Sequence, residues 1–137
     1  MEKIQEKSII SMRRFQEPDA GEVSELIKKT LTETNSKNYP KAVISHLVAH
    51  VTPKQIVKLS HSLYRIVLTE GDGIVATGAY EKKLFRRGMI KALYIMPTYQ
   101  GYGLGRQIVK HLEQIAREEN VRTMKLEASL WCSGVLY

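Results

Sequence analysis

The most constraining feature of this chain is a run of glycines between an apolar segment and an amphipathic one. Glycine stands at alternate positions from Gly101 to Gly105, directly after the apolar run 89–96. Pro97 ends that run, because proline cannot donate to a sheet ladder, and from Leu104 the apolar residues recur at helical spacing. The sequence therefore predicts a strand, a glycine loop and a helix start in immediate succession.

Such a loop favours an anion. Glycines remove the side chains that would keep an anion from the backbone N–H groups, and a first helical turn offers unpaired donors with a partial positive charge. A dinucleotide loop would have its third glycine where Arg106 stands and an acidic residue about 20 positions later, which residues 121–125 do not supply. A Walker loop would end in Gly-Lys-Ser or Gly-Lys-Thr, and the chain has neither. The spacing therefore excludes both common phosphate loops.

Period-two and helical patterns along the chain predict an α/β domain. Strands are expected at 9–15, 63–69, 74–80, 89–96 and about 124–128. Helices are expected to start near Asp19, Pro40, Pro53 and Leu104, the last running to about Glu119 with Asn120 as its C-terminal cap. Gly71-Asp72-Gly73 has the composition of a tight hairpin turn, and 82–88 that of a basic turn.

Composition narrows the class of protein. The length of 137 residues, with 43% hydrophobic content, predicts a single domain over residues 1–137. The net charge of +7 attracts polyanions, but the basic residues are scattered as short pairs, which argues against a nucleic-acid partner. Cys132 is the sole cysteine, which indicates a reducing, cytoplasmic location. An apolar run long enough for a membrane span is absent, so no membrane association is expected.

The segment Gln100-Gly101-Tyr102-Gly103-Leu104-Gly105 resembles the cofactor signature of the GNAT family of N-acetyltransferases: Gln or Arg, two residues, Gly, one residue, then Gly or Ala. Segments 13–20 and 125–129 also resemble the first and fifth strand regions of that family, so residues 9–129 follow its order. The resemblance implies a mixed, mostly antiparallel sheet flanked by helices. The family's last two strands are missing here, so we expect a C-terminal truncation whose open sheet edge is covered by a second copy of the chain.

The resemblance implies acetyl-CoA as co-substrate, with its pyrophosphate over the N–H groups of 101–106 and its pantetheine arm along the strand ending at Ile95. Because the family splays its fourth and fifth strands, backbone groups of Leu93 and Ile95 are expected to bond the arm and polarise the thioester carbonyl. The cofactor-binding residues expected are Leu93, Tyr94, Ile95, Gln100, Gly101, Tyr102, Gly103, Leu104, Gly105 and Arg106. The reaction implied is acetyl transfer to a primary amine by direct attack.

The catalytic residues match the family less closely. Where many members carry a glutamate this chain has Arg87-Gly88-Met89, so Glu127 and Glu81 are base candidates by location alone. Tyr137, in a Leu-Tyr pair resembling the family's Phe-Tyr, is the candidate acid for the departing thiolate.

Two other functions stay open: a catalytically silent module that binds acetyl-CoA or CoA, and a basic nucleic-acid module. No metal site is proposed, because His46 and His50, four residues apart, have no third ligand nearby. The acceptor amine is not identified by any motif.

Overall fold

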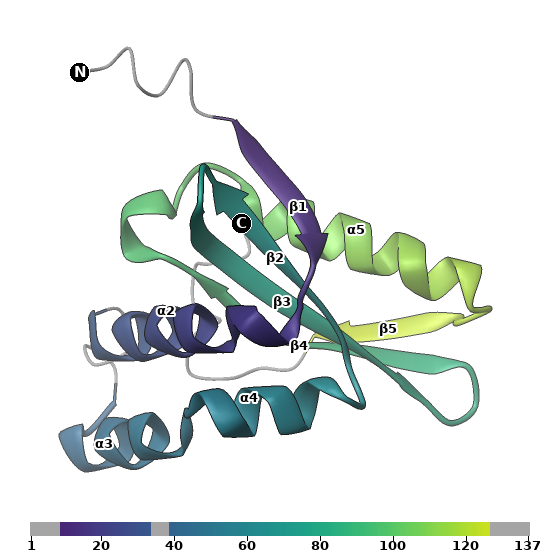
Figure 1. The fold of residues 1–137 in the computed structure, drawn as a ribbon. Coiled ribbons are helices and arrows are strands. Elements are labelled where there is room, and N and C mark those ends of the chain that lie inside the picture. The colour runs from purple at the N-terminus through teal and green to yellow at the C-terminus, as the bar shows by residue number, and fades with distance from the viewer. Residues whose placement is uncertain (1–8, 34–38, 127–137) are drawn as a thin grey trace.

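The computed structural model describes residues 9–33 and 39–126. These residues form one five-stranded sheet with helices on both of its faces (Figure 1). The strands are β1 Ile10–Arg14, β2 Tyr64–Glu70, β3 Gly73–Lys83, β4 Arg87–Ile95 and β5 Thr123–Leu126. The α-helices are α2 Ala20–Glu33, α3 Lys41–His50, α4 Pro53–Ser60 and α5 Leu104–Glu118, with short 3₁₀ turns at Glu17–Asp19 and Pro97–Tyr99.

The sheet follows chain order, β1-β2-β3-β4-β5, and its pairs are antiparallel except for the parallel pair β4–β5. This confirms the mixed, mostly antiparallel sheet. The predicted hairpin is also confirmed: Gly71, at a φ of +61°, and Asp72 form the turn between the paired residues Glu70 and Gly73.

The prediction of a basic turn over residues 82–88 is wrong, because four of these seven residues belong to strands. Lys82 and Lys83 continue β3 and pair with Gly88 and Arg87 of β4, so the turn is confined to residues 84–86. Strand pairing uses the backbone, and exposed lysine and arginine side chains on a projecting hairpin do not oppose it.

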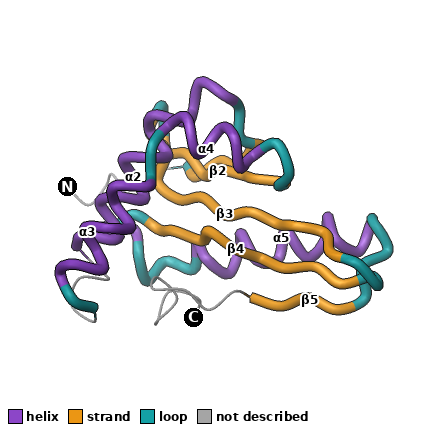
Figure 2. Tube along the Cα trace, turned by 90° about the horizontal axis from the view of Figure 1, so that it is seen from below, coloured by secondary structure: helices purple, strands orange, loops and turns teal. Residues whose placement is uncertain are grey.

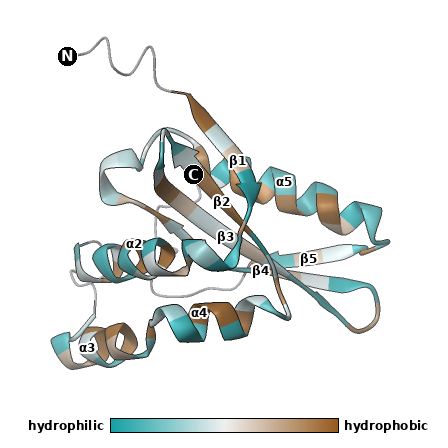
Figure 3. Cartoon of the chain, in the orientation of Figure 1, coloured by the Kyte–Doolittle hydropathy of each residue, from teal (hydrophilic) through white to brown (hydrophobic). Residues whose placement is uncertain are grey.

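Each face of the sheet has its own core. On one face α5 packs through residues such as Ile108 and Leu112 against Ile66 and Leu93. On the other, α2 and α4 pack through residues such as Val23 and Ile56 against Val67. Figures 1 and 2 show the helices divided in this way between the two sides of the sheet. Along α5, hydrophilic and hydrophobic residues alternate in Figure 3, as expected for a helix with one buried face.

The helix ends follow the local sequence. Beyond α5, Asn120 has a φ of +64°, its N–H donates to the carbonyl of Arg117, and that of Val121 donates to Ala116, both at 3.0 Å. The cap residue is therefore Glu119, one position before the expected Asn120, and Asn120 is the left-handed residue that follows the cap and ends the helix. In α3 the apolar side is less buried than the pattern indicates: Ile44 is buried, but Val43 is 40% exposed. The reason is that α3 makes its main contacts with α2.

Candidate functional site

The glycine loop lies where β4 ends and α5 begins. The N–H of Met96 still bonds the carbonyl of Val75 on β3 at 2.9 Å, and the 3₁₀ turn Pro97–Tyr99 then reverses the chain. Gly101 and Gly103 follow with φ of +91° and +80°. A Cβ at either glycine would meet no heavy atom of the described residues within 4 Å. Glycine therefore suits the left-handed backbone, and none of the described residues fills the space in front of these two positions.

The first turn of α5 presents unpaired donors. Gly103 is the N-terminal cap. The first hydrogen bond of the helix runs from the N–H of Gln107 to the carbonyl of Gly103, at 3.1 Å. Among the described residues, the N–H groups of Gly103, Leu104, Gly105 and Arg106 donate to no backbone carbonyl, and no side chain caps the helix. Four donors at the positive end of a 15-residue helix form a binding place for an anion.

Side chains fix the loop to the sheet. Gln100 Nε2 donates to the carbonyl of Ile95 at 3.1 Å, and Thr30 Oγ1 of α2 donates to the same carbonyl at 3.4 Å. The Tyr99 hydroxyl donates to Glu70 at the end of β2, and this hydrogen bond raises the pKa of Tyr99. The first motif residue, Gln100, thus holds the loop against β4.

The expected cofactor residues are brought together at this loop. The side chains of Leu93, Ile95 and Leu104 are buried in the α5-side core, so their backbone atoms are the groups that a ligand could reach. Tyr102 is 66% exposed, and Arg106 is exposed on α5. A cavity of about 160 Å³ runs between α5 and β5, lined by Arg106 and Lys125 among others. The carboxylate of Glu113 lines the same cavity, so its charged side chains leave one net positive charge.

Strand β4 contains a bulge that the sequence analysis did not anticipate. Lys91 pairs with Ala79 and Tyr94 with Thr77, so Ala92 and Leu93 together stand opposite one residue of β3. Ala92 has a φ of +55°, a left-handed conformation for a non-glycine residue. The extra residue turns Lys91 and Tyr94 to the α4 side while Leu93 stays on the α5 side. Within the described residues, β5 pairs with β4 only from Arg87 to Ile90, ahead of the bulge.

A cavity of about 280 Å³ lies on the α4 side of this bulge. Glu81 lines it, and its Oε1 accepts from Lys91 at 2.9 Å and from Lys83 at 3.4 Å. The hydrogen bond from Lys91 is the main reason that the pKa of Glu81 lies below its usual value. A carboxylate stabilised in its charged form is a weak proton acceptor, so Glu81 is poorly suited to be the general base.

The other candidate residues are not joined to the loop by any described contact. Glu127 and Tyr137 lie outside the described residues, as does Cys132. His46 and His50 stack at 4.5 Å between ring centroids, and His50 Nδ1 lies 2.8 Å from the carbonyl of His46. In the described part of the chain, groups of three or more potential metal ligands are absent. No helix there is both long and apolar enough to cross a bilayer.

The residue that the sequence analysis missed most clearly is Arg65. It stands on β2 inside the run Tyr64–Leu68 and is buried with an unpartnered Nη1. The signal that could have found it is a single charge within an otherwise apolar strand, since such a residue is seldom buried without a partner.

Comparison with known proteins agrees with this geometry. The model of the acetyltransferase (GNAT) family matches residues 25–131, and no curated protein sequence matches the chain. The fold is similar to that of PaiA N-acetyltransferase from Thermoplasma acidophilum in complex with coenzyme A, with a TM-score of 0.79 at 12% identity, over 88% of this chain and 79% of that one.

Two further solved structures have the same fold. A GNAT family acetyltransferase from Brucella melitensis in complex with acetyl-CoA has a TM-score of 0.68 at 14% identity, over 88% of this chain and 77% of that one. The ribosomal-protein-S18-alanine N-acetyltransferase from Escherichia coli has a TM-score of 0.64 at 16% identity, over 88% of this chain and 67% of that one.

Proposed function

The chain belongs to the GNAT family of acetyl-CoA-dependent acetyltransferases, and we propose that its acceptor is a primary amine that attacks the acetyl group directly. The single observation that carries the proposal is the row of N–H groups from Gly103 to Arg106, which donate to no backbone carbonyl in the described part of the chain and lie directly after a bulged strand. The row suits a diphosphate, and the strand end suits an extended arm that leads away from it.

The residues present fit acetyl-CoA. No described residue fills the space at the Cβ positions of Gly101 and Gly103, which leaves room for phosphate oxygens at the backbone, and Arg106 on the first turn of α5 is a cation beside it. We assign Gln100 the role of holding the loop on β4, and Leu93, Tyr94 and Ile95 the role of contacting the pantetheine arm through their backbone. We assign Tyr102, the most exposed aromatic residue of the loop, the role of packing on the nucleotide.

When bound, the co-substrate supplies an activated acetyl thioester. The acceptor nitrogen forms a bond to the carbonyl carbon, the carbon–sulfur bond breaks, the nitrogen loses one proton and the thiolate gains one. Backbone donors of β4 near the bulge would stabilise the oxygen on which negative charge develops. Holding both reactants in place accounts for much of the acceleration.

The proton transfers are assigned by position. We propose that Glu127, one residue beyond β5, accepts the amine proton directly or through water, and that Tyr137 returns a proton to the thiolate. Removal of either carboxylate or hydroxyl, as Glu127→Gln or Tyr137→Phe, should lower kcat about 10²-fold or more while leaving acetyl-CoA binding intact. Unchanged kcat in either variant would remove that residue from the mechanism.

The experiment that tests the site uses Gly103→Glu. A carboxylate at the α5 start would occupy the anion position, so the thermal stabilisation produced by acetyl-CoA should disappear. Gly21→Glu is the matched control, because Gly21 is an exposed glycine on α2 with no heavy atom near its Cβ position. Gly103→Ala separates backbone strain from charge and should keep part of the shift. A full acetyl-CoA shift in Gly103→Glu would contradict the site.

A catalytically silent CoA-binding module is the second candidate. It is favoured by the absence of a family glutamate at Arg87-Gly88-Met89. Release of free CoA in the presence of an amine panel distinguishes the two functions: tight binding of acetyl-CoA without turnover on any amine would support the silent module.

A further inference from the structure

Arg65 is a buried cation whose hydrogen bonds are incomplete. Its exposed fraction is 3%, and its Nε donates to Ser60 Oγ at 3.0 Å. Its guanidinium carbon lies 5.8 Å from the centre of the Phe15 ring. Nη1 is buried and has no hydrogen-bond partner in residues 9–33 and 39–126. Among the described residues, no carboxylate forms an ion pair with Arg65.

Arg65 remains charged at neutral pH despite its burial. Burial lowers the pKa of its guanidinium to about 10, while nearby Tyr94 acts in the opposite direction. A buried donor on a positively charged group is destabilising unless an acceptor completes it. The acceptor that best matches a guanidinium is a carboxylate or another planar anion, because two parallel N–H···O bonds can form.

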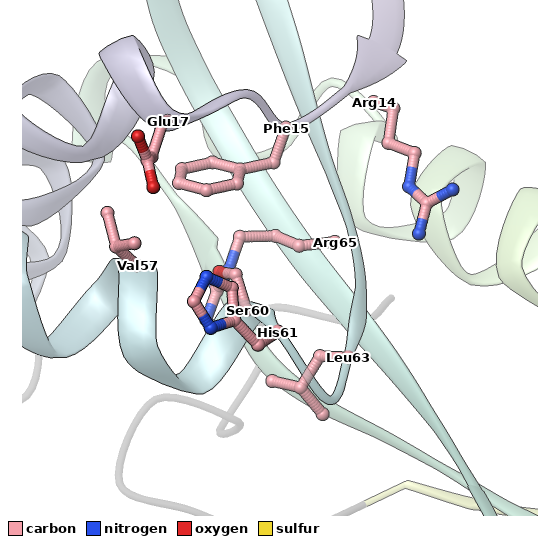
Figure 4. A pocket seen from close by; sticks show the side chains of 8 residues that line it. All are labelled: Arg14, Phe15, Glu17, Val57, Ser60, His61, Leu63 and Arg65. Carbon is pink, nitrogen blue, oxygen red and sulfur yellow. The ribbon is translucent and has the colours of Figure 1, made fainter.

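Arg65 lines two cavities. One, of about 320 Å³, lies between the end of β1 and the end of α4; in Figure 4 the Arg65 side chain crosses it below Phe15 toward Ser60 and His61. The other is the cavity of about 280 Å³ on the α4 side of the β4 bulge. Arg65, Ala79 and Lys91 are cross-strand neighbours in one row of the sheet, so the second cavity extends from Arg65 to β4.

The charges of the second cavity leave Arg65 uncompensated. Lys91 and Glu81, which also line it, are paired with each other at 2.9 Å. The cavity therefore has one surplus positive charge, which attracts an anionic group and repels a second ammonium group on a polyamine. Its volume is near the lower end of small-molecule pockets, about 300–1,000 Å³, and suits a compact ligand.

We propose that the acceptor is a small amine that also carries a carboxylate, and that Arg65 binds this carboxylate. This inference rests on the proposed function, because the cavity joins Arg65 to the bulge of β4 where the thioester is expected. Arg65 binds one end of the acceptor, and the other end presents its nitrogen at the bulge.

The first test compares acceptors that differ in one group. Linear ω-amino acids from glycine to 6-aminohexanoate are assayed for CoA release against n-alkylamines and diamines of the same chain length. We expect kcat/KM for the best amino acid to exceed that of its matched alkylamine by roughly 10- to 100-fold. Equal or better acetylation of alkylamines or diamines would overturn the proposal.

The second test removes the guanidinium. In Arg65→Met the preference ratio should fall toward one, mainly through a higher KM for the amino acid, and Arg65→Lys should retain part of it. Arg14→Met is the control, because Arg14 lines the first cavity but not the second. A preference ratio unchanged in Arg65→Met, or reduced equally in Arg14→Met, would contradict the assignment.

Two further measurements separate a binding role from a structural one. If Arg65 binds the acceptor, Arg65→Met without ligand should melt at or above the wild-type temperature, because an unpaired buried cation has been removed. The acetyl-CoA shift should also remain, which reports the cofactor side independently. Titration of 6-aminohexanoate and its shorter homologues into the CoA-loaded protein by calorimetry does not require turnover. If none of them binds wild type, the carboxylate site is wrong even where the acetyl-CoA shift is present.

Discussion

The two faces of the sheet are built in different ways. On the α5 side the helix lies close to the strands: a Cβ on Gly78 of β3 would stand 2.6 Å from Ile108 Cγ2 and 3.2 Å from Leu93 Cδ1. On the α4 side the same strands border two cavities and a buried arginine. Close packing on the α5 side therefore fixes the positions of backbone atoms. On the α4 side, side chains that line cavities are available to distinguish one ligand from another.

The two sides meet at β4. Its bulge at Ala92 lets Ile90, Leu93 and Ile95 all face α5 while Lys91 and Tyr94 face the cavity. One strand therefore supplies backbone to the proposed cofactor site and side chains to the proposed acceptor site.

Gly78→Ala should reduce the free energy of unfolding by about 2–3 kcal/mol, because its methyl group overlaps a branched side chain of α5. Gly21→Ala is the control on α2, where nothing within 4 Å opposes a Cβ, and it should stabilise by about 0.5–1 kcal/mol. Urea unfolding measures both. If Gly78→Ala is as stable as wild type, Ile108 of α5 does not lie within 3 Å of the Cβ position of Gly78.

Ala79→Gly and Ala92→Gly should differ by about 1 kcal/mol in the free energy of unfolding. Ala79 is fully buried in strand β3, so Ala79→Gly removes a packed methyl group. The glycine also gives the unfolded chain more conformational entropy. At Ala92 the same entropy term is offset by relief of the positive φ. Chemical denaturation of both variants side by side gives the difference, and equal losses would mean that the bulge carries no strain.

Tyr80 should make the α5 side sensitive to alkaline pH. Burial, with the hydrogen bond to Glu119 at 3.1 Å, raises the pKa of Tyr80 to about 12. The folded state holds the hydroxyl proton of Tyr80 more tightly than the unfolded chain does. The contribution of this group to the stability of the fold is therefore complete below about pH 10 and is lost as the pH rises toward 12. Between pH 9 and pH 11 the free energy of unfolding should fall by roughly 1 kcal/mol more in the wild type than in Tyr80→Phe. Parallel stability–pH curves for the two proteins would exclude this contribution.

The pair Arg13–Asp19, at the entry to α2, should give the smallest effect. Arg13 donates to both carboxylate oxygens, at 2.8 and 2.9 Å, and this contact is the first cause of the lowered pKa of Asp19. Asp19→Asn should reduce the free energy of unfolding by about 0.5 kcal/mol at neutral pH, because the pair is partly exposed. Because the carboxyl pKa is lower in the folded state, the stabilisation by the pair is present above the unfolded pKa and is lost as the pH falls through the folded pKa. The difference between wild type and Asp19→Asn should therefore shrink as the solution is acidified. A difference that persists in acid would point to the hydrogen bond from Gln16 instead.

Much of the cofactor side could be predicted because its information is local. Proline at 97, alternate glycines and the apolar repeat after Leu104 each constrain the backbone within a few residues, and the structure has the expected strand, loop and helix there. The positive φ values at Gly101 and Gly103 agree with that expectation. Gln100 was expected from the motif, but its bond to the Ile95 carbonyl required the folded loop.

The α4 side could not be predicted in the same way. Arg65 and Lys91 are 26 residues apart in the numbering and become neighbours only through the registers β2–β3 and β3–β4. The bulge shifts the face of every β4 residue after it, so a strict period of two places Lys91 with Leu93 on one side, which is wrong. Glu81 was a base candidate by location, and its pairing with two lysines is a tertiary contact.

By itself the sequence determined the order of strands and helices, the glycine loop and the family, because turn residues, apolar periodicity and a contiguous motif act over short distances in the chain. The tertiary structure alone decided which strand residues face each helix layer and which charges pair. It also decided that Arg65 is buried with one nitrogen, Nη1, that has no acceptor among the described residues. Those outcomes depend on strand register and on a single inserted residue, and register is set by the packing of the whole sheet.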